Sequence, residues 1–189
     1  GGFLNLEGEE KESNDNRSYS KSSIPKRMAV IVAGGLVNII FGLTTYFLLI
    51  LIRYMIVKNM SFVTAISYSA QSLGLLIQSM FDGIIQLFTG KVGMNDMMGP
   101  VGISEMVSQT SGIVEFIYLL SIISVSLGMT NLLPIIPLDG GKFLLLIIEA
   151  IRKKPLDKEL ELKIQSYGCL LLVLFSAIIA VNDIIRWIH

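Results

Sequence analysis

The chain has 189 residues, of which 52% are hydrophobic and 16% are charged, and its mean hydropathy is +0.67. A soluble domain carries about 25% charged residues, so this composition predicts an integral membrane protein. The 15 basic residues balance the 15 acidic ones, which leaves no net positive field to attract nucleic acid. The single cysteine excludes a fold held by internal disulfides. Because the chain begins at Gly1 rather than methionine and has no signal-peptide pattern, we expect a fragment or a processed form.

Residues 1–27 precede the first long apolar run and form the first predicted segment. Gly1–Leu6 is the only β-like stretch in the chain, and residues 9–24 are polar and rich in serine and asparagine. The polar stretch predicts a flexible cytoplasmic loop. Ser23, followed by Ile24 and Pro25, is typical of a helix start.

Three uncharged runs are long enough to cross a membrane, which takes about 20 apolar residues. They predict transmembrane helices at 28–57, 113–138 and 164–188. The first helix contains Asn38 shortly after Gly34 and Gly35. Small residues let a second helix approach closely, and an amide can form a hydrogen bond across that contact. Packing is therefore the simpler interpretation of Asn38.

Residues 58–112 are predicted to be an extracytoplasmic linker that contains an amphipathic helix at 60–89. Its apolar residues recur at helical spacing, and Thr64, Gln71 and Gln78 lie on another face. Such a helix is better suited to lie on a membrane or on other helices than to cross alone. Residues 90–112 are expected to be a glycine-rich outer loop.

The distribution of basic residues predicts the topology. Eleven of the 15 Lys and Arg residues lie in 1–27 and 139–163, and basic loops stay cytoplasmic. This places the N-terminus inside and the C-terminus outside, whereas a fourth span at 59–81 would put the two basic segments on opposite sides. Within the basic loop 139–163 we expect an interfacial helix at 142–153, followed by a helix that Asp157 caps.

The second span ends at a helix break that is flanked by polar residues. Pro134 and Pro137 remove backbone donors, Asn131 precedes them and Asp139 follows. Burying a carboxylate at membrane depth costs at least a few kcal/mol unless it is paired or bound to a cation. Asp139 therefore either marks the interface and caps the next helix through Gly140 and Gly141, or serves as a metal ligand or proton carrier.

Other candidate ligands are sparse in the sequence. Glu115 and Asp183 lie at span edges, where we expect them to be solvated. The only histidine is His189, the last residue. The chain alone therefore does not build a catalytic zinc site with three protein ligands of the usual kind.

The segment from Asn131 to Gly141 resembles the NxxPxPxLDG signature of the site-2 protease family, which are intramembrane zinc metalloproteases, and especially its bacterial RseP-type branch. Other stretches resemble this branch in the same order along the chain: Gly1–Glu9 (GG[YF]VKMxGE), Ala33–Asn38 (AGPxxN, with Gly35 in place of proline), Gly99–Ile103 (GPVGI) and Glu149–Pro155 (ExIxxxP). One departure is that Pro137 lies three residues after Pro134 rather than two.

The resemblance implies a multi-pass, all-α protein of the bacterial inner membrane that cleaves transmembrane segments of membrane proteins. Asp139 would be the third zinc ligand, and the other two would come from the HExxH helix of the family. That helix and the PDZ domain of the branch are absent here, so the HExxH ligands are expected upstream and this chain alone is expected to be inactive.

The resemblance also implies roles for residues that contact substrate. Asn131, and also Asn38, would be catalytic residues that hydrogen-bond to a substrate carbonyl or an unwound helix. A re-entrant, hairpin-like β segment would pair with the substrate backbone; it comprises Gly1, Gly2, Phe3, Leu4 and Asn5. The expected partners are a transmembrane substrate and the lipid bilayer, and the amphipathic helix would gate access from the outer face.

Two other functions remain open from the sequence. A non-catalytic relative would act as a membrane scaffold or substrate-binding protein, and its binding would not depend on Asp139. An ion or proton carrier would use Asp139, although a transport path usually needs more than one intramembrane carboxylate.

Overall fold

The computed structural model describes residues 22–93, 97–154 and 156–188. Within these ranges the secondary structure is entirely helical, as the all-α prediction requires: α1 (Ile24–Ile56), α2 (Phe62–Phe88), α3 (Pro100–Ser108), α4 (Ile113–Asn131), α5 (Asp139–Arg152) and α6 (Lys158–Ile188). The predicted β segment at residues 1–6 lies outside the described residues.

Three helices of the described part are long and apolar enough to cross a membrane: Ile24–Ile56, Ile113–Asn131 and Glu159–Trp187. They overlap the three predicted spans, with different ends. α1 begins after Ser23 and carries Pro25 in its first turn, where proline costs no hydrogen bond. Asp157 accepts a hydrogen bond from the Glu159 amide (3.0 Å) at the start of α6, as predicted.

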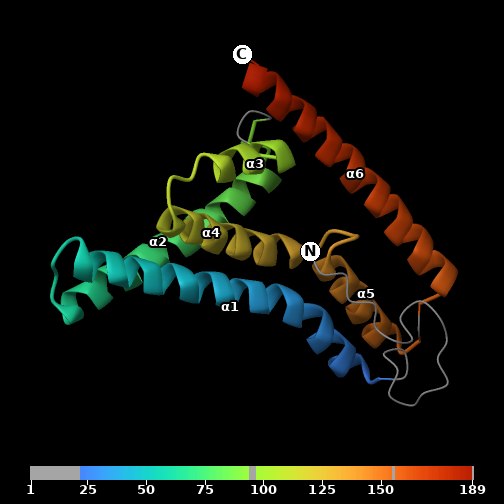
Figure 1. The fold of residues 1–189 in the computed structure, drawn as a ribbon. Coiled ribbons are helices and arrows are strands. Elements are labelled where there is room, and N and C mark those ends of the chain that lie inside the picture. Colours follow the sequence, from blue (N-terminus) through green and yellow to red (C-terminus); the bar gives the residue numbers. More distant parts are fainter. Residues whose placement is uncertain (1–21, 94–96, 155, 189) are drawn as a thin grey trace.

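The core of the fold is the contact between α1 and α4, which run side by side in Figure 1. A Cβ atom added to Gly42 would lie 2.6 Å from the Ser121 carbonyl oxygen. One added to Gly128 would lie 2.6 Å from the Gly35 carbonyl oxygen. The two backbones therefore approach as closely as glycine allows, and Val125 is buried between them. Small residues serve in this way where lipid gives no hydrophobic drive to helix pairing.

α2 is the predicted amphipathic helix, and it packs on other helices. It contacts α1, with the rings of Tyr54 and Tyr68 centred 5.5 Å apart, and it crosses behind α4 in Figure 1. The hydroxyl of Ser126 on α4 donates a hydrogen bond to the sulfur of Met80 on α2 (3.5 Å). α2 is described but is not one of the three helices that are long and apolar enough to span a membrane.

The prediction that residues 90–112 form a loop is wrong for Pro100–Ser108, because these residues form the helix α3. The prediction that Asp183 is solvated is also wrong. This carboxylate on α6 is 5% exposed, and its Oδ2 accepts hydrogen bonds from the amides of Gly99 and Gly102, both at 2.9 Å. A helix N-terminus leaves amides unsatisfied and favours negative charge, so Asp183 stabilises α3 from another element. Glu115 is exposed, as predicted.

Figure 1 shows α6 apart from the α1–α4 pair, meeting α3 near its C-terminal end. A guanidinium nitrogen of Arg186 also donates to the Met97 carbonyl oxygen (3.4 Å) at this contact. The C-terminal part of α6 is thus fixed to the segment that contains α3.

Candidate functional site

The candidate site begins where α4 ends. The Leu132 amide is shared between the carbonyl oxygens of Gly128 (3.3 Å) and Met129 (3.2 Å), and the Leu133 amide bonds to Thr130 (3.0 Å). These shorter-range bonds tighten the last turn, and Pro134 then supplies no amide. The helix therefore ends at Asn131 rather than at residue 138, the end of the predicted span.

Two tight turns connect α4 to α5. The amide of Ile135 donates to the Leu133 carbonyl oxygen (2.7 Å), and the amide of Leu138 donates to the Ile135 carbonyl oxygen (2.8 Å). The Leu138 carbonyl oxygen then accepts the amides of Gly141 (3.0 Å) and Lys142 (3.2 Å) and so begins α5. Asp139 becomes the first residue of α5, three residues earlier than the predicted helix start.

Two buried glycines let the start of α5 press against this connection. A Cβ atom added to Gly141 would lie 2.7 Å from the Ile135 carbonyl carbon and oxygen. One added to Gly140 would collide with the carbonyl oxygens of Leu132 and Leu133. The Asp-Gly-Gly sequence thus places a carboxylate on a helix start that is packed directly on backbone.

Asp139 faces α1 at Gly34. A Cβ atom added to Gly34 would lie 3.8 Å from Oδ2 of Asp139, and one added to the next residue, Gly35, would lie 2.9 Å from Cγ of Leu132. Two of the motifs that carry the family resemblance, Ala-Gly-Gly and Leu-Asp-Gly, therefore meet in space. The missing side chain at Gly34 leaves room beside the half-buried carboxylate.

The far end of α5 is also joined to α1. Arg27 and Glu149 form an ion pair of 3.0 Å whose side chains are 16% and 15% exposed. Since Asp139 lies at Gly34 and Glu149 at Arg27, α5 runs antiparallel to the first turns of α1. Sequence reasoning missed this pair, although Glu149 belongs to one of the stretches that resemble the family.

The other predicted site residues lie near this region or outside the described ranges. Asn131 is the half-buried last residue of α4. Asn38 lies one turn beyond Gly34 on α1, and its backbone carbonyl oxygen accepts a hydrogen bond from the Ser124 hydroxyl (2.9 Å). The predicted substrate-pairing segment 1–5 lies outside the described residues.

The donor chemistry of the site fits one ligand of a metal. A carboxylate oxygen is an accepted zinc ligand, and Asp139 presents one beside the open space at Gly34. Within the described ranges, no three His, Cys, Asp or Glu side chains gather that could hold a metal ion. A complete zinc site therefore needs donors besides those in the described part of the chain.

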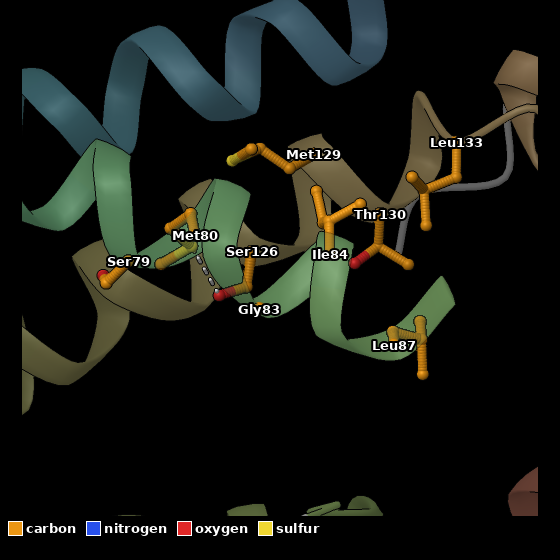
Figure 2. A pocket seen from close by; sticks show the side chains of 9 residues that line it. All are labelled: Ser79, Met80, Gly83, Ile84, Leu87, Ser126, Met129, Thr130 and Leu133. Atoms are coloured by element: carbon orange, nitrogen blue, oxygen red, sulfur yellow. Dashed lines mark hydrogen bonds between the residues drawn. The ribbon is translucent and has the colours of Figure 1, made fainter. Parts of the chain in front are cut away.

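A cavity of about 330 Å³ lies between α2 and the C-terminal part of α4 (Figure 2). Its lining is mainly apolar, and three of the lining side chains carry a hydroxyl group. The lining residues are Ser79, Met80, Gly83, Ile84, Leu87, Ser126, Met129, Thr130 and Leu133. Thr130 and Leu133 flank the end of α4, so the cavity borders the connection that leads to Asp139.

Comparison with known proteins gives consistent matches. Residues 1–175 match the model of Peptidase family M50. Over 125 residues the chain is 39% identical to zinc metalloprotease RasP of Bacillus licheniformis and 38% identical to regulator of sigma-W protease RasP of Bacillus subtilis, covering 65% of this chain and 30% of each relative. It is 35% identical over 130 residues to zinc metalloprotease RasP of Shouchella clausii, covering 68% of this chain and 31% of the relative. The match thus spans less than a third of the length of these relatives.

Proposed function

The chain belongs to Peptidase family M50, the site-2 protease family, and we propose that it forms part of an intramembrane zinc metalloprotease of the bacterial inner membrane. Its substrates are transmembrane segments of membrane proteins, and its own contribution to the metal site is Asp139. The observation that carries this proposal is the position of the Asp139 carboxylate, on the first residue of α5 and facing Gly34 of α1.

The depth of this carboxylate supports the proposal. Gly34 lies seven residues after Arg27, which is about 10 Å along a helix, inside an apolar stretch that begins at Met28. Carboxylates within membrane-spanning segments are rare, and they generally mark ion or substrate pathways.

The residues of this chain hold the carboxylate in place. The turns at 133–138 fix the chain before Asp139, and the glycine contacts of α5 fix the chain after it. The chemistry that zinc supplies in such enzymes is the activation of water near neutral pH. We propose that the two remaining protein ligands come from a segment outside these 189 residues.

Substrate binding follows from the polar groups around the same connection. We propose that the amides of Asn131 and Asn38 donate hydrogen bonds to a substrate carbonyl or to a locally unwound substrate helix. Because a helix closes its own backbone bonds, an extended partner strand would stabilise the unwound form. Residues 1–5 would supply that strand.

The topology completes the proposal. The basic ends of α1 and α5 meet at the Arg27–Glu149 pair, which supports placing residues 1–27 and 139–163 on one face. By the positive-inside rule that face is cytoplasmic, and the C-terminus lies outside.

The direct test uses the complete gene product in a cell membrane, with a reporter that carries a transmembrane segment as the candidate substrate. Asp139→Ala should abolish cleavage while leaving protein level and membrane insertion unchanged. Asp82→Asn, which changes an exposed carboxylate on α2, is the matched control and should cleave normally. Cleavage at the wild-type rate by Asp139→Ala would refute the proposal. Normal substrate capture without cleavage by the wild-type protein itself would identify a non-catalytic relative instead.

A further inference from the structure

We propose that Gly168 of α6 is a positioning residue for Asp139, because its missing side chain lets α6 pack directly on the backbone of the α4–α5 connection. This inference rests on the proposed function, in which Asp139 binds zinc. Gly168 lies outside the short motifs that carry the family resemblance in the sequence.

The contact is between backbone atoms. A Cβ atom added to Gly168 would lie 2.6 Å from the carbonyl oxygen of Ile136, 2.8 Å from its carbonyl carbon and 3.1 Å from its Cγ2. Any side chain at position 168 would thus meet a peptide group rather than the flexible end of a side chain.

The adjacent peptide group is contacted by α5. A Cβ atom on Gly141 would meet the carbonyl carbon and oxygen of Ile135, the residue before Ile136, at 2.7 Å. The segment Ile135–Ile136 therefore contacts two glycines, Gly141 on α5 and Gly168 on α6. A methyl group on either glycine requires the segment or the helix that carries the glycine to shift.

Movement of this segment reaches Asp139 directly. Ile136 lies three residues before Asp139, inside the turn closed by the Leu138 amide and the Ile135 carbonyl oxygen (2.8 Å). The Leu138 carbonyl oxygen in turn starts α5 through the amides of Gly141 and Lys142. A shift of Ile136 is thus passed through one turn to the first residue of α5.

α6 is held at one place beyond Gly168. Asp183 lies 15 residues further on, or about 22 Å along the helix, and accepts hydrogen bonds from two amides of α3. A methyl group at position 168 needs a separation of at least 3.0 Å from the Ile136 carbonyl oxygen, about 0.4 Å more than the structure provides. α6 and the α4–α5 connection share this shift, and the part taken up by the connection moves the chain that leads to Asp139.

The size of the effect follows from the sensitivity of metal sites. Disturbing the groups that orient a metal ligand costs about 10- to 100-fold in metal affinity or activity. A methyl group at Gly168 acts through several bonds, so we expect the lower end of this range. A residue that merely supports helix packing would change the unfolding temperature and leave the zinc dissociation constant unchanged.

The experiment uses the purified full-length protein in nanodiscs and compares wild type with Gly168→Ala. We measure zinc affinity against a competing chelator, and kcat and KM for a transmembrane peptide. Gly168→Ala should weaken zinc binding about tenfold and lower kcat about tenfold, with KM unchanged. Two controls should match wild type: Gly74→Ala, where an added Cβ meets nothing within 4 Å, and Ala177→Val on the exposed side of α6.

A second variant covers the case in which Gly168→Ala does not fold. Ile136→Ala shortens the side chain that abuts Gly168 without creating a clash, and it should weaken zinc binding severalfold. Wild-type zinc affinity and kcat in either folded variant would overturn the positioning role while leaving the proposed function intact. A wild-type protein that neither binds zinc nor cleaves would instead overturn both.

Discussion

Replacing Asp183 by alanine removes a carboxylate oxygen that two backbone amides share. The amides of Gly99 and Gly102 each lie 2.9 Å from this oxygen, and Asp183 is 5% exposed. In the alanine variant the first turn of α3 loses the acceptor for both amides, and α6 loses its anchor on α3.

The magnitude follows from these two bonds. A hydrogen bond to an ionised group contributes about 1.5–3 kcal/mol, so two give at most about 6 kcal/mol. The Gly102 bond is only partly buried, and water replaces some of its contribution in the variant. We expect Asp183→Ala to lower the free energy of unfolding by about 3 kcal/mol. Asp183→Asn keeps an oxygen acceptor but no charge, and should lose about half as much, because charge-assisted bonds are about twice as strong as neutral ones.

The assay combines equilibrium unfolding in mixed micelles with amide hydrogen exchange. Exchange at Gly99 and Gly102 should accelerate strongly in Asp183→Ala, and less in Asp183→Asn. Glu115→Ala removes an exposed carboxylate that bonds locally to Ser111 and should leave both amides protected. Unchanged exchange at Gly99 and Gly102 in Asp183→Ala would refute the account of how α3 is stabilised.

Three further predictions follow from other contacts. Arg27→Ala or Glu149→Ala removes the partly buried ion pair and should cost about 1–3 kcal/mol. A double-mutant cycle measures the coupling energy, and strictly additive effects would contradict the pair. Gly42→Ala forces a methyl group to within 2.6 Å of a backbone oxygen on α4 and should destabilise the protein by about 1–3 kcal/mol. Thermal unfolding measures this loss, and an unchanged unfolding midpoint would show that α1 and α4 are not so closely packed. Cysteines at Lys153 and Trp187 should react with impermeant thiol reagents from opposite sides of the membrane; labelling from the same side would rule out the three-span topology.

The three long helices were predictable because hydrocarbon thickness sets a simple requirement. Uncharged runs of about 20 residues located α1, α4 and α6 within a few residues, and Ser23 with Pro25 indicated where α1 begins. The end of α4 was less accurate, since the prolines indicate a break but not that the helix ends three residues before Pro134.

α3 and Asp183 were missed for a common physical reason. A sequence rich in glycine between 90 and 112 has low helix propensity, and the carboxylate that stabilises its helix lies more than 80 residues later on α6. Periodicity along one segment carries no information about such a partner. The same applies to Gly168, whose glycine is explained only by the nearby backbone of Ile136.

The candidate site was predicted in part. The Leu-Asp-Gly sequence indicated Asp139, and the Ala-Gly-Gly sequence indicated a close helix contact, but no pattern showed that Asp139 faces Gly34. That neighbour depends on where α4 ends and on how α5 folds back along α1. Both depend on tertiary packing and are visible only in the folded chain.

The most direct test of the central claim is the zinc dissociation constant of the full-length protein, measured against a competing chelator for wild type and Asp139→Asn. Asparagine preserves the size of the side chain but removes the anionic ligand. The account predicts one tightly bound zinc per wild-type molecule and a large loss of affinity in Asp139→Asn. An equally tight zinc in the variant would contradict the assignment of Asp139 as a metal ligand.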